Sequence, residues 1–136
     1  MKGKLSLLAL FAALFFAACS SPVDDANLRV KYNFNPDWLL YVGDAEGAEA
    51  MDYDDSQWEA VTLPHAYNED DAYHKPIHMH TTGISWYRKH FQVPAEDNGK
   101  KIFIEFEGAR FGVDIYLNGK HIGFHENGVM AFGFDI

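Results

Sequence analysis

The sequence predicts an all-β fold, an antiparallel β-sandwich, and three observations lead to it. Apolar side chains alternate at Val113, Ile115 and Leu117, which is the period-two pattern of a half-buried strand. Asn118-Gly119 follows at once, and this dipeptide favours the tight primed turn of a β-hairpin. Similar short segments recur between turn signals along the whole chain, without a long amphipathic helix, as is typical of sandwiches.

The return strand of this hairpin is expected to place Ile122 and Phe124 on the same apolar face. A lone hairpin is only marginally stable in water. Other strands must therefore cover that face, and the remaining alternating segments are the candidates. They span residues 29–35, 38–42, 59–63, 85–93, 101–107 and 130–136.

Residues 65–82 form the longest stretch without a strand or helix period. A loop of this length inside a compact domain is uncommon and is usually functional or disordered. The stretch is rich in polar and histidine side chains, which makes it the first place to look for a site.

The N-terminus has the layout of an exported bacterial lipoprotein signal. Lys2 and Lys4 precede an apolar run over 5–16, and small residues then lead to Cys19, the one cysteine of the chain. We therefore expect a signal peptide over 1–18, lipidation of Cys19, a polar tether over 19–27 and the β-sandwich domain over 28–136. An ordinary secretory signal that is cleaved elsewhere is the alternative. Either way the protein is exported, and in the first case it is lipid-anchored to the cell envelope.

The formal net charge of −9 argues against two classes of partner. Such a surface repels the phosphates of nucleic acids and of anionic lipids. We expect no nucleic-acid partner, and membrane contact only through the lipid on Cys19.

Several sequence blocks resemble, in order, the N-terminal sugar-binding-type domain of family 2 glycoside hydrolases, which include β-galactosidases, β-glucuronidases and β-mannosidases. The resemblance covers about Trp38 to Ile136. The blocks are TrpGluAlaValThrLeuProHis (58–65), GlyIleSerTrpTyrArgLysHisPheGlnValPro (83–94), PheGluGlyAla (106–109), IleTyrLeuAsnGlyLysHisIleGly (115–123), HisGluAsnGly (125–128) and PheGlyPheAspIle (132–136).

The resemblance implies a jelly-roll sandwich, similar to galactose-binding domains, that stands before an immunoglobulin-like domain and a catalytic TIM barrel. In the family, further strands of the sandwich follow the PheAspIle block, so we expect an incomplete, truncated module. Retaining hydrolysis needs two carboxylates about 5–5.5 Å apart, and in the family the barrel of about 250 residues supplies both. We therefore expect no catalytic residue and no cofactor here, and we interpret the acidic pairs at 54–55 and 70–71 as solvated.

The resemblance also implies that loops of this module reach toward the substrate pocket and help to shape it. The stretch 65–80 occupies the corresponding place. Its candidate hydrogen-bonding residues for sugar hydroxyls are Asn68, Asp71, His74, His78 and His80.

A zinc site at the three histidines is the alternative, but their spacing matches no common zinc motif and no cysteine partner is present. We therefore predict no metal. Trp58 and Trp86 are interpreted as packing residues rather than sugar-stacking ones, because large aromatic side chains are mostly buried.

Three functions remain open on the sequence. The first is a non-catalytic module of an exported β-glycosidase, which meets its glycan substrate through the full-length enzyme. The second is a free-standing carbohydrate-binding lipoprotein of the cell surface. The third is a purely structural β-sandwich lipoprotein.

Overall fold

The computed structural model describes residues 29–136 of the chain. The predicted signal over 1–18, the tether over 19–27 and the lipidated Cys19 lie outside the described residues. None of the helices in the described part is long and apolar enough to cross a membrane.

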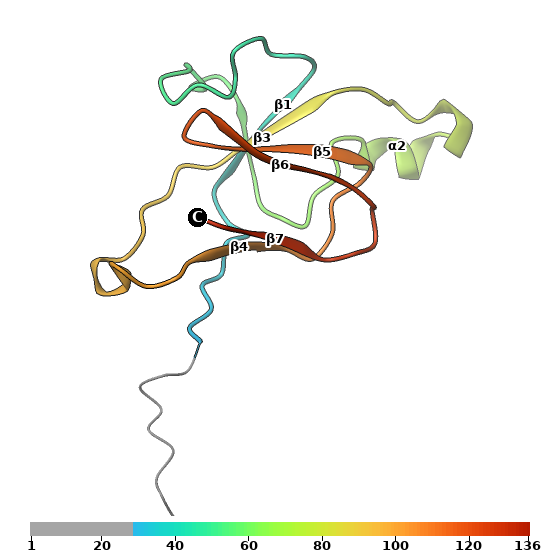
Figure 1. The fold of residues 1–136 in the computed structure, drawn as a ribbon. Coiled ribbons are helices and arrows are strands. Elements are labelled where there is room, and N and C mark those ends of the chain that lie inside the picture. The colour runs from blue at the N-terminus through green and yellow to red at the C-terminus, as the bar shows by residue number, and fades with distance from the viewer. Residues whose placement is uncertain (1–28) are drawn as a thin grey trace, which may run out of the picture. The chain divides into compact units, whose positions relative to one another are not determined.

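The chain divides into two units, Met1–Tyr32 and Asn33–Ile136. Every strand and helix described here belongs to the second unit, which is nearly all β-structure with antiparallel pairing throughout. The prediction of an all-β sandwich is confirmed (Figure 1).

Three sheets make up the second unit, with strand orders β2–β1–β3, β4–β7 and β5–β6. The β4–β7 pair lies below the other two sheets in Figure 1. Three short helices lie in the connections. The strands are β1 (Trp38–Val42), β2 (Glu59–Val61), β3 (Ser85–Arg88), β4 (Phe103–Phe106), β5 (Gly112–Leu117), β6 (Lys120–Glu126) and β7 (Phe132–Asp135), and the helices are α2 (Glu69–His74) and the 3₁₀ turns η2 (Ile77–Met79) and η3 (Ala95–Asp97).

The buried core lies on the inner face of the β2–β1–β3 sheet. Trp38 and Leu40 alternate on β1 and pack with Val61 of β2, and all three are at most 9% exposed. Tyr87 of β3 and Phe106 of β4 pack against them. Since Phe106 comes from the β4–β7 pair, the core joins two layers, as a sandwich requires.

The hairpin predicted at residues 113–124 is confirmed. Asn118 and Gly119 have φ angles of 51° and 78°, which is the geometry of a primed turn. The predicted inward residues follow the expected alternation, and Ile115 is buried.

The prediction that Phe124 faces inward was wrong. A β-bulge interrupts the ladder, because Ile115 pairs with Gly123 whereas Tyr116 pairs with His121, so Ile122 is the extra residue. One extra residue reverses the facing of the side chains that follow it. Phe124 is therefore 56% exposed.

Other predicted strand bounds also change. Residues 29–35 form no strand, because the Asn33 side chain accepts the Asn35 N–H locally, and such bonds compete with a ladder. The predicted strand over 85–93 ends at Arg88, since its partner β1 begins only at Trp38, next to the positive-φ turn residue Asp37.

Gly123 is required where the hairpin packs on β7. A Cβ atom at this position would overlap the ring of Phe134. We expect Gly123→Ala to lower the free energy of unfolding by about 2 kcal/mol, the usual range for overpacking. Denaturant titration measures this. Gly83→Ala is the control, since a Cβ atom there meets nothing within 4 Å, and equal losses in both variants would contradict the packing argument.

Candidate functional site

Residues 65–83, called the arm below, project from the sandwich as the segment that carries α2 (Figure 1). The sequence predicted no regular structure here, and that prediction was wrong. The arm contains the helix Glu69–His74 and the 3₁₀ turn η2. A six-residue helix is too short to give a periodic sequence pattern, but its acidic first turn, which suits the helix dipole, was a readable signal.

Hydrogen bonds tie the two ends of the arm together. The Asn68 side-chain amide donates to the carbonyl of Thr81 over 2.7 Å, and the Thr81 N–H donates to the Asp71 carboxylate over 2.6 Å. The Gly83 N–H donates to the Tyr67 hydroxyl over 3.2 Å. The arm is therefore a closed, internally braced loop.

Asp71 is the centre of this bracing. Its carboxylate forms an ion pair with Lys75 over 2.7 Å, one helical turn along the chain. The hydrogen bond from Lys75, followed by the one from the Thr81 N–H, holds the pKa of Asp71 far below its usual range. The ring of His80 hydrogen-bonds the Lys75 carbonyl over 3.1 Å and so joins the same cluster.

The five predicted site residues thus fall into two groups. Asn68, Asp71 and His80 are brought together around Thr81 and Lys75, where their polar atoms brace the arm. His74 lies on the outside and bonds the carbonyl of Asp70 over 2.8 Å, and exposed His78 makes no hydrogen bond within the described residues. No group of three or more potential metal ligands occurs in the described part of the chain.

The base of the arm contains a polar pair that the sequence reasoning did not single out. The His65 ring lies 3.0 Å from the Tyr87 hydroxyl, and both side chains are partly buried. Burial raises the pKa of Tyr87. The sequence offered a clue to this pair. The strand alternation places Tyr87 inward, and His65 directly follows the Pro64 that ends a predicted strand.

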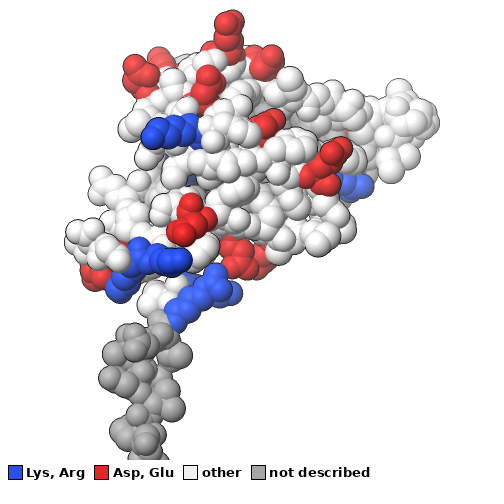
Figure 2. Space-filling view, viewed as in Figure 1, with Lys and Arg blue, Asp and Glu red and all other residues white. Residues whose placement is uncertain are grey.

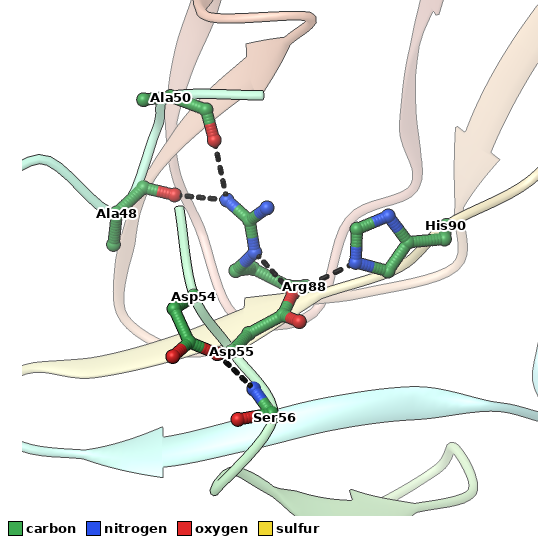
Figure 3. A network of polar contacts seen from close by, with 7 residues as sticks. All are labelled: Ala48, Ala50, Asp54, Asp55, Ser56, Arg88 and His90. Atoms are coloured by element: carbon green, nitrogen blue, oxygen red, sulfur yellow. Dashed lines mark hydrogen bonds and ion pairs between the residues drawn. The ribbon is translucent and has the colours of Figure 1, made fainter. Parts of the chain in front are cut away.

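A second network holds the loop between β1 and β2 against β3 (Figure 3). The Arg88 Nε donates to the Asp55 carboxylate over 2.8 Å, and its Nη1 donates to the carbonyls of Ala48 and Ala50. His90 lies 2.7 Å from the same Asp55 oxygen.

Asp55 keeps its charge in this setting although its side chain is only 15% exposed. Burial acts to raise the pKa of Asp55, but the hydrogen bonds from Arg88 and His90 outweigh it, so the pKa lies below its ordinary value. The neighbouring Asp54 accepts the N–H of Ser56 over 3.1 Å, which forms a local turn.

Both tryptophans of interest pack against aromatic rings, in agreement with their interpretation as packing residues. The ring of Trp58 stacks on Tyr41 at 5.5 Å, and the ring of Trp86 lies 6.0 Å from Tyr116. The buried Trp86 Nε1 has no hydrogen-bond partner among the described residues. It lines a broad open hollow bounded by the inner strand faces, the arm and the loop before β5.

The arrangement offers surfaces for binding and packing rather than groups for bond cleavage. In each acidic pair one carboxylate is occupied by a cation, Asp55 by Arg88 and Asp71 by Lys75. A retaining dyad needs two free carboxylates at a fixed separation. The geometry therefore defines the class of an antiparallel β-sandwich module.

Comparison with known proteins gives the family. Residues 53–132 match the family described as the β-galactosidase second all-beta domain. The chain belongs to this family, and it is a non-catalytic domain of the family 2 glycoside hydrolases. The resemblance drawn from the sequence blocks is confirmed.

The relatives that match this chain carry two enzyme names, β-glucuronidase and β-galactosidase. A β-glucuronidase of Formosa agariphila is 41% identical over 79% of this chain and 12% of its own length. A β-galactosidase of Thermoanaerobacter pseudethanolicus is 42% identical over 76% of this chain and 14% of its own. The chain thus spans a small fraction of these relatives.

Solved structures agree with the fold. The β-glucuronidase of Bacteroides uniformis aligns with a TM-score of 0.72 and 32% identity, over 76% of this chain and 12% of that one. A β-glucuronidase from glycoside hydrolase family 2 aligns with a TM-score of 0.71 and 37% identity, over 80% of this chain and 13% of that one.

We predict that Asp55→Asn lowers the free energy of unfolding at neutral pH by about 2 kcal/mol, the usual worth of a hydrogen bond to a charged group. The folded pKa of Asp55 lies below the unfolded value of about 3.9. Its stabilisation is therefore full above about pH 4 and is lost as pH falls through the folded pKa. Denaturant titration against pH should show the wild type approaching the variant in acid.

The matched control for this series is Asp52→Asn, which changes an exposed carboxylate on the same loop. Its unfolding free energy should stay near that of the wild type. A difference between wild type and Asp55→Asn that does not shrink with acid would contradict the assigned ion pair.

We predict that Asp71→Asn loosens the arm without unfolding the sandwich. The Thr81 N–H loses its charged acceptor, and Lys75 loses its ion-pair partner. Hydrogen exchange should speed up at Thr81 and not at Leu40 in the core. Asp70→Asn is the control, because only the backbone carbonyl of Asp70 takes part in a described bond. Unchanged exchange at Thr81 would show that the bracing bond does not hold the arm.

Proposed function

We propose that this chain is the accessory module of an exported β-glycosidase and that its arm forms part of the wall of the substrate pocket. The observation that carries this proposal is the bracing of the arm by Asn68, Asp71 and His80. A segment fixed before the substrate arrives loses little entropy on binding, which is how positioning elements contribute to affinity and rate.

The arm also has the surface that such a role needs. Its apolar side chains Tyr73 and Ile77 are 84% and 85% exposed. Contiguous apolar side chains on a protein surface mark interaction sites, and we propose that these two contribute to one. Catalytic carboxylates would come from another domain of the complete enzyme, since in each acidic pair here one carboxylate is engaged by a cation.

The substrate class follows from the relatives, which carry the names β-glucuronidase and β-galactosidase. We propose a β-linked glycoside as the substrate. The five residues predicted from the sequence remain candidates for pocket residues. His74 and His78 are exposed on the surface of the arm, and the other three hold the arm.

Export and anchoring are part of the same proposal. The signal pattern over 1–18 and the position of Cys19 support a lipid-anchored enzyme of the cell envelope, in contact with the membrane only through that lipid. Cys19→Ser should abolish incorporation of radiolabelled palmitate and release the protein from membranes. Labelling that persists in the variant would refute the anchor.

The central test extends the reading frame beyond the codon for Ile136 and assays the complete product. We expect further domains and cleavage of a chromogenic β-glucuronide or β-galactoside. Asp71→Asn should lower kcat/KM more than Asp52→Asn does, because only the first loosens the arm. A stop codon directly after Ile136 in a stable protein that binds sugars would instead favour a free-standing binding protein.

A further inference from the structure

One face of the β5–β6 hairpin gathers aromatic and polar side chains that are open to solvent. Asp114 and Tyr116 lie on the face of β5 opposite the buried Ile115. Tyr116 pairs with His121 of β6, and Asp114 pairs with Phe124. Residues that pair directly across two antiparallel strands share a face, so all four side chains lie on this one. Asp114, Tyr116, His121 and Phe124 are called the platform below.

The β-bulge at Ile122 brings Phe124 onto the platform. Without the extra residue, Phe124 would face inward, and bulges that re-aim a side chain occur often beside functional sites. A Cβ atom on Gly112 would lie 3.3 Å from the Phe124 ring, so the ring lies against this glycine. Phe124 is 56% and Tyr116 is 39% exposed. Two aromatic rings from neighbouring strands are therefore available on one face.

The polar part of the platform is a histidine–carboxylate pair. The Nε2 atom of His121 lies 2.8 Å from a carboxylate oxygen of Asp114, and the rings of His121 and Tyr116 lie 5.1 Å apart. An ionised carboxylate only accepts hydrogen bonds, so His121 donates from Nε2, and its neutral ring keeps a lone pair on Nδ1. Both side chains are exposed. The pair therefore presents acceptors to solvent, and a ligand that donates hydrogen bonds fits it.

Charge also limits what the platform can bind. A second histidine–carboxylate pair in the described part of the chain, His90 with Asp55, is closed by Arg88, and its carboxylate side chain is only 15% exposed. The carboxylate of Asp114 has no such cover. The chain carries a net charge of −9, and acidic side chains are spread over the face that Figure 2 shows. Such a surface repels anions. A partner that is rich in donors and carries no negative charge is complementary to the platform.

We propose that the platform binds a neutral glycan chain. Tyr116 and Phe124 present flat apolar surfaces, which suit the C–H faces of pyranose rings. Asp114, oriented by His121, accepts hydrogen bonds from sugar hydroxyl groups, and such bonds to a charged acceptor are strong. This goes beyond the proposed function, because it assigns a glycan contact to the hairpin and requires neither the arm nor a catalytic domain.

The test is an NMR titration of the chain with the neutral oligosaccharide β-1,4-galactotetraose, followed through the backbone amides. We expect saturable shifts at the four platform residues at millimolar concentration. Phe124→Ala should weaken binding about tenfold, because it removes one stacking surface. Asp114→Asn should weaken it about fivefold, since a charged acceptor is replaced by a neutral one. Gly112→Ala should weaken it as well, because the added Cβ atom displaces the Phe124 ring without removing it.

Phe103→Ala is the matched control, since it removes a ring of similar exposure, 53%, on β4. It should leave binding unchanged, and the amide of Leu40 in the core reports whether each variant keeps its fold. Absence of saturable shifts, or unchanged binding in Phe124→Ala, would overturn the inference. Equal binding of the polyamine spermine at the same residues would also overturn it, because the platform would then be a site for cations. These outcomes are separate from the proposed function, which depends on the glycosidase activity of the complete product and on the arm.

Discussion

The ion pair between the partly buried guanidinium of Arg88 and Asp55 is the interaction on which this end of the sandwich depends. The Arg88 side chain is 13% exposed, and a charge held there must find hydrogen-bond acceptors within the protein. Asp55 and two backbone carbonyls of the loop between β1 and β2 supply them, so the loop has to fold back onto β3. The rings of Tyr53 and Trp58 lie 5.7 and 5.9 Å from the guanidinium and complete its surroundings. One residue of a strand thereby organises a loop of more than a dozen residues.

Asp71 organises the arm in a comparable way, on a smaller scale and nearer to solvent. Its carboxylate joins the end of α2, through Lys75, to the last part of the arm, through the Thr81 N–H. The pair of His65 and Tyr87 connects the base of the arm to the core. The arm is therefore continuous with the packed interior through polar contacts, and this continuity lets a projecting segment be both exposed and fixed.

The differences between the expected and observed elements have local causes. Phe124 faces solvent because Ile122 is an extra residue in the ladder, and alternation alone does not reveal a bulge. The sequence predicts no regular structure in the arm because a helix of six residues shows less than two turns of periodicity. The sequence and the family resemblance placed all five candidate residues in one segment, 65–80. Which polar atoms face one another within it depends on how Asn68 and Asp71 meet Thr81, more than ten residues along the chain.

The sequence by itself determined the all-β class, the primed hairpin at Asn118-Gly119 and membership of a glycosidase family, because these depend on local backbone preference, period-two alternation and ordered motifs. Only the tertiary structure decided that Asp71 braces the arm, whereas His78 makes no hydrogen bond with the residues that the structure describes. Whether a polar side chain is engaged within the fold depends on which groups distant in sequence come within hydrogen-bond distance of it. Only the folded chain brings those groups together.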